Sequence, residues 1–198
     1  SLWGTVFDNT IDAFAKLIDE GQPVDPLRPK LIFNRANHLR FIVDWIFLPM
    51  GVTQVLYLDN DICARHNVNE LLKTPGTKAV VAAQRTDDNG KPVKRYGKEG
   101  VLPGDDFVRK YGYKYSFNAG VVVLRPQTVC TYELLAKTME VQLYHNQVRN
   151  LWLAGTNQPP FEIAVAQSLT IVPFHWNCRM MQSDMASLKE HGLTTWSP

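Results

Sequence analysis

Short apolar runs alternate along the chain with segments whose apolar residues follow helical spacing. Four runs rich in β-branched and aliphatic residues predict strands, at residues 54–58, 78–84, 120–124 and 169–174. The first of these is typical of a central parallel strand, because strands buried on both faces have continuous apolar sequences. Helical spacing predicts helices over residues 8–20, 37–48, 68–73, 126–144 and 161–167. This alternation indicates an α/β domain.

Composition narrows the functional classes. The chain has 198 residues, 45% of them hydrophobic and 20% charged, which is the usual composition of one globular domain. Lys and Arg number 21 against 19 Asp and Glu, so the net charge of +2 gives no case for nucleic-acid binding. The longest apolar run, residues 41–50, is broken by Asp44 and is too short to span a bilayer. Three scattered cysteines predict reduced thiols rather than a disulfide framework.

The clearest chemical feature is an acidic pair, Asp59-Asn60-Asp61, directly after the first predicted strand. Ligands of open α/β sheets bind beyond the carboxyl ends of strands. Two carboxylates there can hold a hard divalent cation, which in turn can bind a diphosphate. One alternative is that Asp59 only caps a turn. A calcium-binding EF-hand loop is excluded, because Cys63 stands where an oxygen ligand belongs and Ala64 where a glycine is needed.

Three further places carry candidate chemistry. The small pair Ala119-Gly120 lets a ligand approach the backbone, and the amide of Asn118 can bind hydroxyls; the alternative is a glycine bulge. Arg40 lies on an apolar predicted helix, where a charge needs a partner such as phosphate; the alternative is a surface ion pair with Asp44. Trp176 follows the last predicted strand and could stack on an acceptor sugar or belong to the core.

These motifs resemble those of glycosyltransferases with the GT-A fold. The segments 55–62 and 69–72 resemble the metal-binding segment of family 8, which includes glycogenin and the bacterial lipopolysaccharide galactosyltransferases. The segment 116–121 resembles that family's Phe-Asn-Ala-Gly-Val motif and follows in the right order. Weaker matches are the segment 157–162, similar to an Asp-Gln segment at a late helix, and residues 39–41, similar to an Arg-bearing early helix. The resemblance covers roughly residues 37–177.

The resemblance implies a fold and a set of roles. It implies a GT-A-like α/β fold with a mixed, mainly parallel central sheet flanked by helices, in one catalytic domain over residues 1–198. It also implies Mn²⁺ or Mg²⁺ held by two carboxylates against the diphosphate of a UDP-sugar. The metal ligands would be Asp59 and Asp61; the donor-binding residues Arg40, Asp59, Asn60, Asp61, Asn118, Ala119 and Gly120; the catalytic positions Gln158 and Asn157; and the acceptor-binding residue Trp176.

Three departures from the family pattern bear on these roles. Asn157 stands where the family has Asp, and an amide cannot act as a base or a nucleophile. Before the Arg-bearing helix, residues 5–8 are the one candidate for the family's nucleotide-binding strand. The family's third metal ligand is a His in a late His-x-x-Gly segment, and only His191 offers a weak match, so that segment is altered in this chain or missing from it.

The sequence therefore predicts a metal-dependent hexosyltransferase that moves a sugar from a UDP-sugar to a hydroxyl of a glycan, glycoprotein or other acceptor, with retention. One alternative is a sugar-phosphate nucleotidyltransferase, but the Gly-rich basic loop expected near the start of such an enzyme is not found in this sequence. The second alternative is a non-catalytic sugar- or nucleotide-binding module, which Asn157 and the altered His segment favour. The lack of a glycosylation sequon favours the cytoplasm, and the Golgi lumen is the alternative for an excised domain.

Overall fold

The computed structural model describes residues 9, 12, 13, 16, 40–59, 62, 67–76, 78–84, 106–113, 116–129, 131–152 and 157–177. The elements are α3 (Val43–Phe47), η2 (Leu48–Met50), β1 (Val55–Leu58), α4 (Asn69–Leu72), β2 (Val80–Gln84), α5 (Asp106–Lys110), β3 (Phe117–Leu124), α6 (Thr131–Gln147), α7 (Gln158–Ala164), η3 (Ala166–Ser168), β4 (Leu169–Val172) and η4 (Phe174–Asn177). Among the described residues, no helix is long and apolar enough to cross a membrane.

The four described strands form one mixed sheet in the order β1-β3-β2-β4. β3 runs antiparallel to both of its neighbours, and β2 runs parallel to β4. Three strands therefore point the same way and β3 alone is reversed, which confirms the predicted mixed α/β fold. One expectation was wrong in detail. Residues 54–58 were expected to form a central parallel strand, but β1 lies at one end of the described sheet and its ladder with β3 is antiparallel. No residue of β1 is fully buried, and an apolar run does not fix the direction of a strand.

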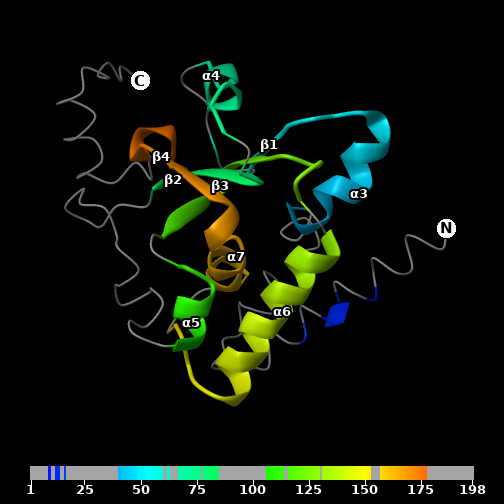
Figure 1. Cartoon of the computed structure of the whole chain (residues 1–198). Coiled ribbons are helices and arrows are strands. Elements are labelled where there is room, and N and C mark those ends of the chain that lie inside the picture. Colours follow the sequence, from blue (N-terminus) through cyan, green and yellow to red (C-terminus); the bar gives the residue numbers. More distant parts are fainter. Residues whose placement is uncertain are drawn as a thin grey trace.

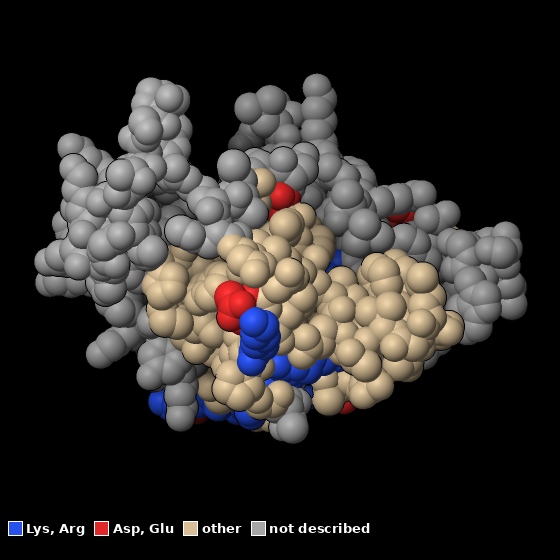
Figure 2. All heavy atoms as spheres, turned by 90° about the horizontal axis from the view of Figure 1, so that it is seen from above, with Lys and Arg blue, Asp and Glu red and all other residues tan. Residues whose placement is uncertain are grey.

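Alternate residues of β2 and β3 point to opposite faces of the sheet and build two separate apolar clusters. Val80 and Val122 lie in one cluster with residues of α3, α6 and α7. Val81 and Val121 lie in the other, with Leu71 of α4 and Trp176 of η4. Figure 1 shows the same layers, with α4 on one side of the sheet and α6 and α7 on the other. Figure 2 shows the molecule from above, the α4 side, where acidic and basic side chains lie beside each other on a mostly uncharged surface.

Several predicted boundaries shift for local reasons. The helix predicted from residue 126 begins at Thr131, because residues 126–128 form a turn in which Thr128 and Val129 donate backbone hydrogen bonds to Arg125 O. The helix predicted from residue 161 begins at Gln158 instead, since prolines are tolerated in a first helical turn. The helix predicted over residues 37–48 corresponds to α3, and it is buried only in part: Phe41 is buried, whereas Ile46 and Leu48 are exposed.

Candidate functional site

The site lies at the end of β1, where Asp59 follows the last strand residue, Leu58. Leu58 pairs with Val121 in the last register position of the β1–β3 ladder. The Asp59 N–H then donates to Gly120 O at 2.8 Å, so the acidic residue lies beside β3. A Cβ placed on Gly120 would lie 3.1 Å from Asp59 Oδ2. Glycine at this position therefore provides the space that the Asp59 carboxylate occupies.

The register of the β2–β3 ladder breaks at this point of β3. Ala82 pairs with Val122, but Gln84 pairs with Phe117, so the ladder is irregular between these two positions. The backbone of residues 118–120 therefore lies outside regular pairing with β2, and its polar groups form hydrogen bonds with side chains instead. Irregular ladders of this kind are common beside active sites.

Arg40 connects β1 to this part of β3. It is buried, and its Nη1 donates to Ala119 O at 3.2 Å. Its Nη2 donates to Tyr57 Oη at 3.3 Å and lies 3.7 Å from Asp59 Oδ1. The guanidinium carbon lies 4.7 Å from the centroid of the Tyr57 ring, within cation–π range. A surface ion pair with Asp44 does not describe this residue, because Arg40 is buried and its charge faces Asp59.

Tyr57 contributes a phenol that stays protonated at neutral pH. Burial raises the pKa of Tyr57 above its ordinary value of 10.0. The positive charge of Arg40 opposes the rise, while a hydrogen bond to the Asp59 carboxylate and the negative charge of Asp59 add to it. The phenol can therefore donate to Asp59 while its oxygen accepts from Arg40, and the three side chains hold one another in place.

Gln158, the first residue of α7, approaches the same stretch of β3. Its Nε2 donates to Phe117 O at 3.0 Å and to Glu162 Oε1 at 2.8 Å. Its Oε1 lies 3.5 Å from the N–H of Ala119, a long hydrogen bond. Asn157 precedes it as the N-cap of α7; it is buried, and its side chain does not cap the helix.

The structure thus brings together six of the predicted site residues at one edge of β3. One of them is Asn118, whose Oδ1 accepts a hydrogen bond from the N–H of Gly120 at 3.1 Å. The six are Arg40, Asp59, Asn118, Ala119, Gly120 and Gln158. Asn60, Asp61 and His191 lie outside the described residues.

Trp176 lies in η4 and is partly buried. It packs on the apolar cluster between the sheet and α4, which also contains Ile62. These contacts are those expected of the core alternative, and an acceptor-stacking role stays a prediction.

The Asp59 carboxylate has the chemistry of a ligand for a hard cation. Its side chain is 36% exposed, and both oxygens are carboxylate donors of the type that Mg²⁺ and Mn²⁺ prefer. The described residues contain no group of three or more potential metal-binding side chains, so Asp59 would act with residues beyond them. The residues present therefore fit one side of a divalent-cation site.

Sequence reasoning did not single out Glu162. Its carboxylate is buried on α7 and accepts hydrogen bonds from Tyr113 Oη at 2.7 Å and from Ser116 Oγ at 3.0 and 3.1 Å. The available signal was a glutamate within an apolar helical stretch, four residues after Gln158, since glutamate is rarely buried unless it is paired.

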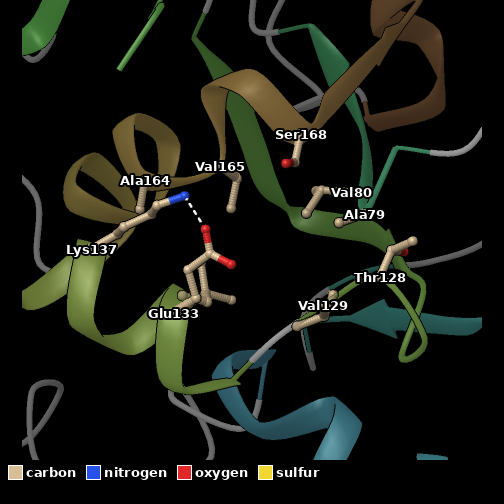
Figure 3. Close-up of a pocket in the computed structure, with 10 residues that line it drawn as sticks. Ala79, Val80, Thr128, Val129, Glu133, Lys137, Ala164, Val165 and Ser168 are labelled. Carbon is tan, nitrogen blue, oxygen red and sulfur yellow. Dashed lines mark hydrogen bonds and ion pairs between the residues drawn. The ribbon is translucent and has the colours of Figure 1, made fainter. Parts of the chain in front are cut away.

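A hollow elsewhere on the surface does not belong to this site. Ala79, Val80 and Val165 line it together with the ion pair between Lys137 Nζ and Glu133 Oε1 (Figure 3). None of the predicted site residues lines it, and its apolar wall is part of the α6–α7 side of the core.

Comparisons with known proteins agree with the geometry. The sequence model of glycosyl transferase family 8 matches residues 8–195. Among solved structures, the chain is similar to one described as the WbbM bifunctional glycosyltransferase in its apo form, with 18% identity and a TM-score of 0.51. The match covers 79% of this chain and 30% of that one, and at this identity it shows the fold alone. Comparison with curated proteins gave no match. The family match covers most of the chain, including the acidic pair, the Asn-Ala-Gly segment and Gln158, so this chain belongs to glycosyl transferase family 8.

Proposed function

We propose that this chain transfers a sugar from a UDP-sugar to an acceptor hydroxyl, with a divalent cation and with retention of configuration. One observation carries the proposal: the Asp59 carboxylate, the Arg40 guanidinium and residues 118–120 of β3 converge at the end of β1. A carboxylate can hold a divalent cation, and cationic groups stabilise the charge that develops on a departing diphosphate.

The metal would be Mn²⁺ or Mg²⁺, held by Asp59 and Asp61. When bound, it would neutralise the charge that develops on the departing diphosphate. Arg40 and Tyr57 keep the Asp59 carboxylate in position through the contacts described above. Gly120 leaves room for that carboxylate, because any larger residue would place a carbon against Oδ2.

The reacting sugar would lie near Gln158. Asn157 holds the place of the family's carboxylate and supplies an amide, which cannot attack the anomeric carbon. The acceptor oxygen would therefore form its bond to the anomeric carbon on the face that the diphosphate leaves. The bond from that carbon to the diphosphate oxygen breaks, and the acceptor proton passes to the departing phosphate. This route needs no carboxylate nucleophile at residue 157.

A panel of nucleotide sugars tests the proposal. Release of nucleoside diphosphate would be measured with Mn²⁺ and with EDTA, for the wild type and Asp59→Asn. Glu70→Gln is the matched control, since Glu70 is an exposed carboxylate whose ion pair with Lys73 contributes little. We expect metal-dependent release of UDP that Asp59→Asn lowers by about 100-fold or more and Glu70→Gln leaves unchanged.

The same assay can contradict each part of the proposal. Full metal-dependent activity in Asp59→Asn would overturn the metal site. An inverted anomeric configuration in the product, read by NMR, would overturn retention. Binding of UDP without turnover of any donor would favour a non-catalytic binding module.

A further inference from the structure

Glu162 has a geometric relation to the site that the proposed function does not use. We propose that Glu162 is a positioning residue: its carboxylate fixes the orientation of the Gln158 side-chain amide beside the reacting sugar. The inference rests on the proposed function, because it assigns a catalytic purpose to a contact within that site. Glu162 would act on residues 118–120 through Gln158, whose Nε2 donates to its carboxylate.

The contacts of Gln158 show how this would work. Its Nε2 carries two hydrogens, and the two nearby acceptors are Phe117 O at 3.0 Å and Glu162 Oε1 at 2.8 Å. If the amide were flipped, its oxygen would face a carbonyl and a carboxylate, which both lack hydrogens to donate. The present orientation turns Oε1 toward the N–H of Ala119. Glu162 and Phe117 O therefore together select which end of the amide faces Ala119, and Glu162 is the side chain of the two that substitution can remove.

Glu162 is itself held rigidly, as a positioning residue must be. Tyr113 Oη donates to its Oε2 at 2.7 Å, and Ser116 Oγ lies within 3.1 Å of both oxygens. These two donors precede β3, whereas Glu162 and Gln158 lie one turn apart on α7. The buried carboxylate thus joins the start of β3 to α7, and a buried charge of this kind persists only where hydrogen bonds satisfy it.

A purely structural role for Glu162 makes different predictions. A carboxylate that only stabilises the packing of α7 on β3 would affect stability and leave turnover of the folded enzyme unchanged. A positioning role requires that loss of Glu162 lowers kcat with little change in the donor KM, and only while Gln158 is present. The two roles therefore separate in kinetics and in the state of the Gln158 amide.

Three substitutions remove different hydrogen bonds of Glu162 and so separate their effects. Glu162→Met keeps much of the side-chain volume and removes every hydrogen bond. Glu162→Gln keeps an acceptor for Gln158, while the hydroxyls of Tyr113 and Ser116 can rotate to accept from its amide. Tyr113→Phe is the matched control, because it removes a hydrogen bond to Oε2 and leaves the Oε1 contact to Gln158 intact.

Two readouts are taken on each variant. The first is the pair of side-chain amide proton resonances of Gln158, identified by their loss in Gln158→Ala. We expect both resonances to be displaced from free-amide values in the wild type, Tyr113→Phe and Glu162→Gln, and to move toward free-amide values in Glu162→Met. The second is steady-state turnover of the donor. We expect kcat to fall about tenfold or more in Glu162→Met, with donor KM changed by less than about twofold, and Glu162→Gln to recover most of the loss.

A double-mutant comparison closes the argument. In the Gln158→Ala background, adding Glu162→Met should lower kcat by little more, since Glu162 acts through the side chain already removed. Full and independent losses would overturn the inference, as would an unchanged kcat or unchanged Gln158 resonances in folded Glu162→Met. If the wild type turns over no nucleotide sugar, the proposed function fails and the catalytic role of Glu162 fails with it. The resonances then still decide whether Glu162 orients Gln158.

Discussion

Replacing Gly120 with alanine tests whether the Asp59 carboxylate lies where the cation is expected. Gly120 does not have a left-handed φ, so alanine adds no backbone strain there. The added Cβ would lie 3.1 Å from Asp59 Oδ2 and 3.5 Å from Ile62 Cδ1. The carboxylate must then move by about 0.3 Å to reach an ordinary contact distance, which exceeds the tolerance of about 0.2 Å in metal–ligand distances.

The expected size of the effect follows from linkage. A ligand at about 100 times its dissociation constant stabilises the folded state by about 2.7 kcal/mol, or about 5–11 °C in Tm for a domain of this length. Displaced positioning groups typically cost metal sites about 10- to 100-fold in affinity. Stabilisation by the same concentration of UDP and Mn²⁺ should then fall to about 1.4–0.4 kcal/mol, or about 1–6 °C.

Thermal unfolding with and without UDP and Mn²⁺ measures this. Gly51→Ala is the control: Gly51 has φ of 70° and no atom near its added Cβ, so alanine should destabilise the free protein by about 1–2 kcal/mol and leave the ligand-induced shift intact. Gly120→Ala should show the reverse pattern. A full ligand-induced shift in Gly120→Ala would refute the placement of the carboxylate.

Three further variants test the surrounding structure. Phe161→Ala should lower the free energy of unfolding in urea by about 3–5 kcal/mol, because the ring is fully buried and edge-packed against two phenylalanines; a loss below about 1 kcal/mol would contradict this. Arg40→Met should cost about 1–3 kcal/mol and most of the UDP–Mn²⁺ stabilisation, since Asp59 loses the cation beside it; wild-type values for both would count against its role. Glu140→Gln tests a pH effect, because the hydrogen bond from Tyr111 lowers the pKa of Glu140 below its ordinary 4.5. The Glu140 carboxylate stabilises the folded state fully above pH 4.5, and this stabilisation is lost as the pH falls through the lowered pKa. The free energy of unfolding of Glu140→Gln should therefore lie about 0.5–1 kcal/mol below the wild-type value at about pH 7, and the difference should shrink at about pH 3. A difference that stays constant with pH would exclude this linkage.

The sequence predicted the fold where the apolar pattern was simple. The β-rich runs at residues 54–58 and 78–84 correspond to β1 and β2, because each is continuous and bounded by polar residues. The pattern predicted only part of β3. Its first residues, Phe117–Ala119, include a polar side chain and precede a glycine, so they do not read as a strand, and the irregular β2–β3 register that holds them there is a tertiary feature.

The site residues were predicted from motifs and from their order along the chain, whereas the contacts between them are seen only in the structure. The spacing of Asp59 from Gly120 along the chain gives no sign that they are neighbours, since the β1–β3 ladder brings them together. Arg40 was predicted near the donor, but its contacts to Ala119 O and Tyr57 depend on the packing of three elements. Glu162 was missed because its importance comes from hydrogen bonds to residues more than forty positions earlier.

The most direct test of the central claim is the binding of UDP measured by titration calorimetry, with Mn²⁺ and with EDTA, for the wild type and Asp59→Asn. We expect UDP to bind the wild type only with Mn²⁺, and binding to weaken by at least about 100-fold in Asp59→Asn. Equal affinity for UDP in both proteins, or equal affinity with Mn²⁺ and with EDTA, would contradict the placement of a metal–diphosphate site at the end of β1.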